Sequence, residues 1–157
     1  MSHPVVPVPR WAVITTFALS LAGLALSIYL TIAHYEGKQL LACSTSGLVN
    51  CGVVTTSAQS HLFGVPVADL GLINYMIMVT LNSPWGWRLS SYWVHVARFV
   101  LAAVAMVFVL WLVYAEFIFI NHICEYCTGV HIVTFALLIV LTRVSPVQLG
   151  WTTSHAQ

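Results

Sequence analysis

The stretch ICEYCTGVHIVTFALLIVLT, residues 123–142, combines a membrane-length apolar run with a pair of closely spaced thiols. An α-helix needs about 20 apolar residues to cross the hydrocarbon core of a bilayer. Cys124 and Cys127 form a C-x-x-C motif at the beginning of the run. This spacing lets two thiols close a small redox-active ring, and the unpaired amide groups of a helix start favour the thiolate. The stretch predicts a membrane helix with a reactive dithiol at one end.

Three further runs, at residues 11–34, 65–81 and 93–120, are apolar enough to be membrane helices. Of the 157 residues, 60% are hydrophobic and only 6% are charged, whereas soluble domains carry about 25% charged residues. The net charge of +1 also provides no basic surface for nucleic acid. We predict a single domain over residues 1–157, an all-α membrane protein folded as a four-transmembrane-helix bundle.

The connection at residues 35–64 is the longest polar segment, and its part at 53–63 mixes apolar and polar residues in a way that predicts a short interfacial helix. An excess of Lys and Arg marks the cytoplasmic side of a membrane protein. With four spans, Lys38 falls on the side of this connection. The other side holds Arg10, Arg88 and Arg143, with Arg98 able to reach back to it along its own helix. We therefore expect both termini in the cytoplasm and the connection on the outer face.

Cys43 and Cys51 lie in this outer connection, so all four cysteines are expected at one membrane face, where disulfides persist. Two dithiols at one face suggest that electrons pass from one pair to the other. Cys127 lies about 4.5 Å deeper in the membrane than Cys124, and His131 follows Cys127 by one helical turn. Cys124, Cys127 and His131 therefore form a line that points into the membrane. A lipid-soluble two-electron acceptor, a quinone, could react at this line, with His131 or Ser57 as hydrogen-bond donors.

Asp69 and Glu116 are carboxylates within the predicted membrane runs. Such groups are costly in a bilayer and are functional candidates by default, here as suppliers of protons.

Two other interpretations of the cysteines stay open at this stage. Four thiolates with a histidine could bind zinc, although an oxidising face disfavours free thiolates and we expect no metal. The cysteines could also be structural disulfides of a non-catalytic membrane protein, although a bridge across so short a loop as C-x-x-C stabilises little.

Taken together, these elements resemble the vitamin K epoxide reductase family in its bacterial form. The resemblance rests on Cys43-x7-Cys51, Ser57, the run Phe63-Gly64-Val65-Pro66 leading to Gly71, and Cys124-x-x-Cys127 at the head of the last helix. Membrane oxidases of the DsbB type also have four helices, four cysteines and a quinone. Their C-x-x-C lies in the first outer loop, so the reversed order here favours the vitamin K epoxide reductase family.

The resemblance implies a role for each cysteine. Cys127 is similar to the family cysteine that reduces the quinone, and Cys124 to its resolving partner, which exchanges with Cys51. Cys43 resembles the loop cysteine that takes electrons from an outside redox protein.

For the cofactor, the resemblance implies a quinone, ubiquinone or menaquinone. The candidate contacts are Ser57, Phe63, Asp69 and His131. Ser57 resembles the family serine near the quinone, while His131 stands where eukaryotic members carry a tyrosine, which leaves the ring preference open.

The implied function is a quinone-dependent thiol oxidoreductase that generates disulfides at the bacterial inner membrane. Many bacterial members carry a fused thioredoxin-like domain that acts as the redox partner. For this chain we expect the partner to be a separate periplasmic thioredoxin-like (DsbA-like) protein. Reduction of vitamin K quinone or epoxide is the alternative activity.

Overall fold

The structure is a computed structural model that describes residues 8–36, 43, 47–89 and 91–148. Its elements, in chain order, are α1 (Arg10–Glu36), α2 (Cys51–Thr55), η2 (Ala58–Ser60), β1 (His61–Leu62), β2 (Val65–Pro66), α3 (Val67–Asn82), α4 (Pro84–Arg88), α5 (Tyr92–Ala115), η3 (Glu116–Ile120) and α6 (Glu125–Gln148). Here η2 is one turn of 3-10 helix and η3 one turn of π-helix. The protein is thus predominantly helical, as the sequence predicts.

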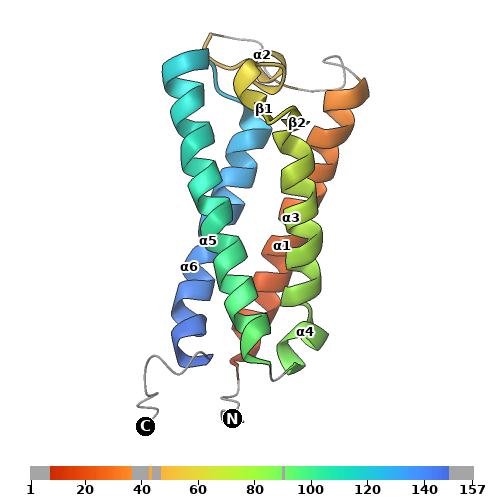
Figure 1. Ribbon diagram of the computed structural model, residues 1–157, viewed down its shortest axis with the longest axis vertical. Helices are drawn as coiled ribbons and strands as arrows, with labels where there is room; N and C mark the ends of the chain where they lie inside the picture. The colour runs from red at the N-terminus through yellow and green to blue at the C-terminus, as the bar shows by residue number, and fades with distance from the viewer. Residues whose placement is uncertain (1–7, 37–42, 44–46, 90, 149–157) are drawn as a thin grey trace.

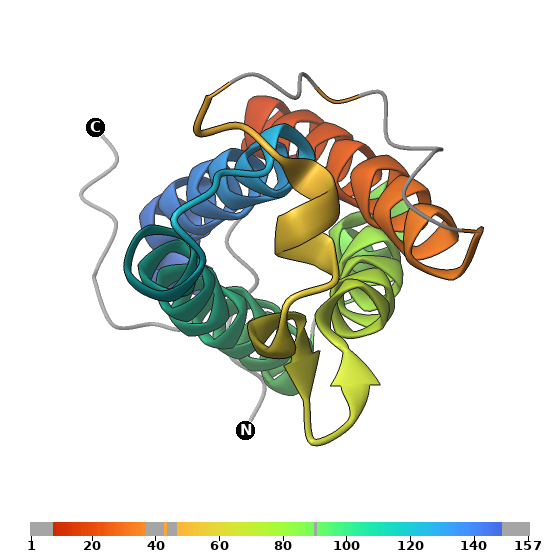
Figure 2. The ribbon, with the colours of Figure 1, turned by 90° about the horizontal axis from the view of Figure 1, so that it is seen from above.

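Four long helices, α1, α3, α5 and α6, run side by side (Figure 1). Helix α1 packs against α3 and α6, and α5 packs against α6. Seen from above, the four helices surround a centre that α2 crosses at one end (Figure 2). The start of α1 and the end of α6 lie at the opposite end of the bundle from α2 (Figure 1).

Three helices are long and apolar enough to cross a membrane: Arg10–Glu36, Tyr92–Ile120 and Glu125–Pro146. Helix α3, Val67–Asn82, is apolar but has only 16 residues. At 1.5 Å per residue it extends about 24 Å, a few ångström less than the hydrocarbon core of a typical bilayer. The protein is therefore a helical membrane protein, and α3 as a fourth complete span stays a prediction.

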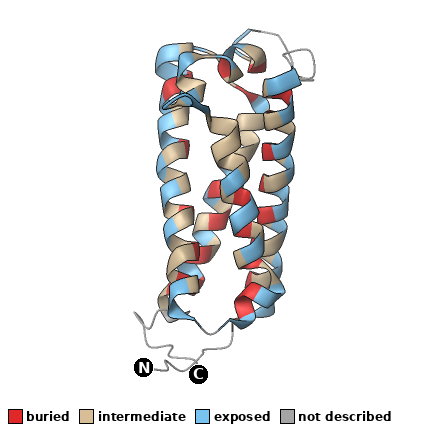
Figure 3. Ribbon diagram, turned by 45° about the vertical axis from the view of Figure 1, so that its right-hand side comes forward, coloured by how far each residue is buried: buried red, intermediate tan, exposed pale blue. Residues whose placement is uncertain are grey.

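Exposed and buried residues divide as expected for a bundle in lipid. The outward faces of the long helices are exposed (Figure 3), and large apolar side chains such as Ile14, Val107 and Leu110 are among those on the surface. Since lipid tails are as apolar as these side chains, the helices gain little from hiding them and associate instead through close packing and hydrogen bonds.

Small residues let α1 approach its neighbours closely. Its buried positions are Ala12, Thr16, Ser20, Gly23, Ser27, Leu30 and Ala33. Gly23 lies against the ring of Tyr75 on α3, so closely that a methyl group at Gly23 would collide with the ring. The Tyr75 hydroxyl in turn bonds with Thr134 Oγ1 on α6 at 2.8 Å. Tyr75 of α3 thus contacts both α1, at Gly23, and α6, at Thr134.

Arg98, near the start of α5, is 1% exposed, because its side chain packs against the end of α3 and against α4. Its guanidinium donates hydrogen bonds to Leu81 O at 2.6 Å and Gly86 O at 3.5 Å, and stacks 3.6 Å from the centre of the Trp87 ring. The first of these carbonyls lies in the last turn of α3, where intrahelical partners run out. Arg98 therefore acts as a buried cap for α3.

At the end of the bundle that α2 crosses, named the outer end from here on, the segment predicted as one interfacial helix at 53–63 is divided. Helix α2 begins two residues earlier, at Cys51, because the side chain of Asn50 caps it by accepting from the Val53 amide at 3.2 Å. The turn η2 follows, and β1 and β2 then form a short antiparallel hairpin with Phe63 and Gly64 at its tip. Both tip residues have positive φ, 52° and 84°. The chain thereby reverses and enters α3.

We predict that Gly23→Ala lowers the free energy of unfolding by about 1–3 kcal/mol, the usual cost of overpacking a core. The matched control is Gly71→Ala, because a methyl group there meets its nearest neighbour, Ser27 Oγ, at an ordinary 3.5 Å. Denaturation of the detergent-solubilised protein by SDS would measure both. Equal stability of the two variants would show that the Gly23–Tyr75 contact does not limit packing.

Candidate functional site

The outer end of the bundle holds one oxidised and one reduced pair of cysteines. Cys43 and Cys51 are joined by a disulfide, with their Cα atoms 6.1 Å apart. Cys124 and Cys127 are free thiols. Cys51 and Cys124 are both 0% exposed and belong to the same apolar cluster, together with Leu30 and other side chains. A loop sulfur and a helix sulfur therefore share one water-free environment.

A short backbone pairing brings these two segments together. Val49 and Ile123 form a parallel β-bridge, in which the Asn50 amide donates to Ile123 O at 3.1 Å and the Ile123 amide donates to Leu48 O at 2.8 Å. Cys51 and Cys124 are the residues directly after these two paired segments. The register of the bridge thus determines which loop cysteine meets the start of α6.

Cys124 occupies the position just before α6, where its sulfur accepts a hydrogen bond from the Cys127 amide at 3.3 Å. The pKa of Cys124 is lowered, first because the Cys127 thiol donates a hydrogen bond to its sulfur, and also because of these amide bonds. Burial opposes this effect without outweighing it. Cys124 is therefore the thiol that the helix start stabilises as an anion, as the C-x-x-C motif predicts.

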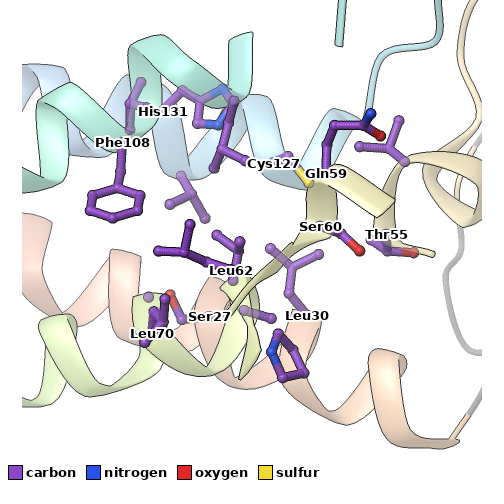
Figure 4. A pocket seen from close by; sticks show the side chains of 18 of the residues that line it. Ser27, Leu30, Thr55, Gln59, Ser60, Leu62, Leu70, Phe108, Cys127 and His131 are labelled. Atoms are coloured by element: carbon purple, nitrogen blue, oxygen red, sulfur yellow. The ribbon is translucent and has the colours of Figure 1, made fainter. Parts of the chain in front are cut away.

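Below the cysteines lies a cavity of about 410 Å³, lined by residues of α1, α3, α5 and α6, with α2 and η2 at its outer end. Its walls are mainly apolar, and its volume is within the range of about 300–1,000 Å³ typical of small-molecule sites. Cys127 lines the cavity, whereas Cys124 does not (Figure 4). Both thiols of the motif thus pack in the cluster around Cys51, but Cys124 is fully buried in it, whereas Cys127 also reaches the cavity wall.

A few polar groups interrupt the apolar wall. His131 lines the cavity together with Cys127 (Figure 4), and Ser57 and Glu116 line it as well. The Ser57 hydroxyl donates to Val54 O at 2.8 Å, so in this arrangement its oxygen is free only to accept. His131 has no hydrogen-bond partner among the described residues and is free to donate to a ligand.

A family model described as "Vitamin K epoxide reductase family" matches residues 14–142. The chain belongs to the vitamin K epoxide reductase family. Membership makes this protein a membrane oxidoreductase with redox chemistry linked to quinones or vitamin K, and the apolar helices and the Cys43–Cys51 disulfide agree with it.

Two residues that the sequence proposed as quinone contacts lie outside the cavity of this vitamin K epoxide reductase family member. Phe63 is 98% exposed because it stands at the tip of the hairpin. Asp69, in the first turn of α3, accepts a hydrogen bond from the Tyr35 hydroxyl at 2.7 Å and is absent from the cavity wall. The structure therefore places Ser57, His131 and Cys127 on the wall of one cavity. Phe63 and Asp69 lie away from that wall.

Sequence reasoning missed two amides on the wall, Asn74 of α3 and Gln59 of η2. Either could donate to a ring carbonyl, and both line the same cavity as Cys127. Asn74 carries a signal that could have found it, because a polar amide within an apolar membrane run is a functional candidate for the same reason as a carboxylate. Gln59 carries none, since glutamine is ordinary in a polar loop.

The zinc interpretation finds no ligand set in the part of the chain that the structure describes, where no three His, Cys, Asp or Glu side chains are grouped to hold a metal ion.

We predict that Cys127→Ala raises the pKa of Cys124 relative to Cys127→Ser. Serine can still donate a hydrogen bond to the Cys124 sulfur, whereas alanine cannot. The thiolate of Cys124 should therefore appear at higher pH in the alanine variant. The ultraviolet absorbance of the thiolate, followed against pH, measures this directly, since Cys43 and Cys51 do not titrate while bonded. Coincident titration curves would rule out the proposed hydrogen bond.

Proposed function

We propose that this protein oxidises the thiols of a separate thioredoxin-like partner and passes the electrons to a membrane quinone. A thiolate of the reduced partner attacks the Cys43–Cys51 disulfide at Cys43, and the resulting mixed disulfide resolves to leave the partner oxidised and the loop pair reduced. Cys51 then attacks a Cys124–Cys127 disulfide at Cys124, so that Cys43–Cys51 reforms and Cys124 and Cys127 become a dithiol. The Cys124–Cys127 pair then gives two electrons to the quinone, which takes up two protons and becomes a quinol, and the Cys124–Cys127 disulfide is restored.

The observation that supports this order is the different surroundings of the two thiols in one motif. Cys124 packs in the same buried cluster as Cys51, and Cys127 lines the cavity. Exchange with the loop therefore falls to Cys124 and reaction with a lipid-soluble ring falls to Cys127. The described state, with the loop pair oxidised and the helix pair reduced, corresponds to the protein just before the quinone reacts.

The quinone ring would occupy the 410 Å³ cavity beside Cys127. We propose His131 as the donor to one ring carbonyl, with Asn74 and Gln59 as further donors and Ser57 lining the wall. Ubiquinone and menaquinone are both candidate rings, and a vitamin K quinone or epoxide is the alternative substrate in this family.

We place the cysteine end of the bundle on the periplasmic side of a bacterial inner membrane and both termini in the cytoplasm. The support is the distribution of charge: the end of the bundle opposite α2 carries Arg10, Arg88 and Arg143. An oxidising compartment at the other end would allow the Cys43–Cys51 disulfide to persist.

The test is quinol formation by the purified protein with a short-chain ubiquinone and a reduced thioredoxin-like protein. We expect Cys127→Ala to abolish quinol formation, because the remaining thiol cannot form the Cys124–Cys127 disulfide. Quinol formation at the wild-type rate in this variant would remove the mechanism.

A second reductant separates the two halves of the route. Dithiothreitol can reduce the helix pair without using the loop. We therefore expect Cys51→Ala to stop oxidation of the thioredoxin-like protein while quinone reduction by dithiothreitol continues. Loss of both activities would contradict separate roles for the two pairs, provided that the variant retains the thermal stability of the wild type.

A further inference from the structure

Glu116 is a buried carboxyl group that the electron route does not use. It begins η3, the π-helical turn that follows α5, and its side chain is 4% exposed. No salt bridge to it occurs among the described residues. Single π-helical turns are rare and frequently occur at functional sites.

Glu116 lines two hollows at once. One is the main cavity, which it shares with Cys127 and His131. The other is a smaller hollow of about 80 Å³, lined by Glu116 together with Leu48, Phe117, Asn121, His122 and Ile123. Glu116 is the one residue common to the two linings. Its carboxyl group therefore stands between the cavity and the outer end of the bundle.

The outer hollow opens toward polar groups. Asn121 is exposed and ends η3 in the left-handed conformation, with φ 54°. His122 is partly exposed, and its Nδ1 lies 3.0 Å from Ile120 O, which leaves Nε2 for water. The titratable groups around Glu116 are Cys124, which interacts with it electrostatically, the cavity residues Cys127, His131, His34 and Tyr75, and His122 on the outer side.

The chemistry of the cavity requires a path for protons. A quinone becomes a quinol by taking up two electrons and two protons. In the proposed route the electrons arrive through sulfur exchange, while the partner's thiol protons are released outside to water. Because the helix start stabilises Cys124 as the anion, the Cys124–Cys127 pair also lacks one of its two protons when it reacts. The mainly apolar wall of the cavity offers few groups that can return a proton to the ring.

We propose that Glu116 is the proton-transfer residue of this protein, carrying protons between the outer hollow and the quinone oxygen. The carboxylate takes a proton from the His122 side, and the carboxylic acid gives it to the oxygen of the reduced ring. Glu116 returns to the carboxylate and undergoes no change of oxidation state. Asp69, the other carboxylate considered, lines neither hollow. This assignment rests on the proposed quinone reductase function.

The experiment is a single turnover of the reduced, full-length protein with a short-chain ubiquinone, in H₂O and in D₂O. We expect Glu116→Gln, which preserves size, to slow quinol formation by about a hundredfold or more, the lower end of the usual range for loss of a general acid. The solvent isotope effect should increase, since proton transfer becomes rate-limiting. Disulfide exchange between Cys43–Cys51 and a reduced thioredoxin-like protein should stay within twofold of wild type.

The matched control is Glu125→Gln, which removes an exposed carboxylate next to Cys124 that lines neither hollow. It should keep the wild-type isotope effect. A purely structural role for Glu116 is separated by chemical rescue: formate should accelerate Glu116→Ala and leave the wild type unaffected.

A wild-type rate in Glu116→Gln, or a slowed Glu116→Ala that formate does not rescue, overturns the proton-transfer role. These outcomes are distinct from failure of the quinone reductase function itself. If Cys127→Ala is inactive while Glu116→Gln is fully active, the proton assignment alone fails. If Cys127→Ala forms quinol normally, the underlying function fails.

Discussion

The arrangement of the site depends on the parallel bridge between Val49 and Ile123. Two backbone hydrogen bonds, of 2.8 and 3.1 Å, hold the outer connection against the segment that enters α6. Each is worth only about 1 kcal/mol in net stability, but together they set a register. That register leaves Cys51 and Cys124 buried in one cluster, with Cys43 and Cys127 partly buried at its edge.

The separation of Cys124 from Cys127 matters because the protein lies in a membrane. In the proposed function, a thioredoxin-like protein works in water and a quinone is dissolved in lipid, so the electrons pass from one phase to the other. This transfer takes place within one helical turn, because Cys124 and Cys127 are three residues apart. The same turn separates a position at the helix start, where the pKa of Cys124 is lowered, from the wall of an apolar cavity. The π-helical turn at Glu116 lies between the same cavity and the outer hollow, and so brings the proposed proton path beside the electron path.

Much of this could be predicted from the sequence, because membrane helices leave strong local signals. The predicted runs at 11–34, 93–120 and 123–142 correspond to three long helices, and the C-x-x-C motif indicated the start of the last one. The position of His131 on the cavity wall followed from helical spacing alone. These features depend on neighbours within a few residues in the chain.

The remainder depends on contacts between segments that are distant in sequence. The bridge between Val49 and Ile123 and the buried hydrogen bond from Arg98 to Leu81 O are set by tertiary packing. No local sequence pattern predicts either of them. Phe63 was placed near the quinone through its motif, but the two-strand hairpin turns it outward. Asn74 was overlooked although its amide interrupts an otherwise apolar run.

The central claim is that Cys51 and Cys124 exchange directly. It is tested most directly in a Cys43→Ser/Cys127→Ser double variant, which retains only these two cysteines. After mild oxidation, mass spectrometry of proteolytic fragments should find them joined in one chain by a disulfide. Two unlinked thiols, or linkage only between separate chains, would contradict the account.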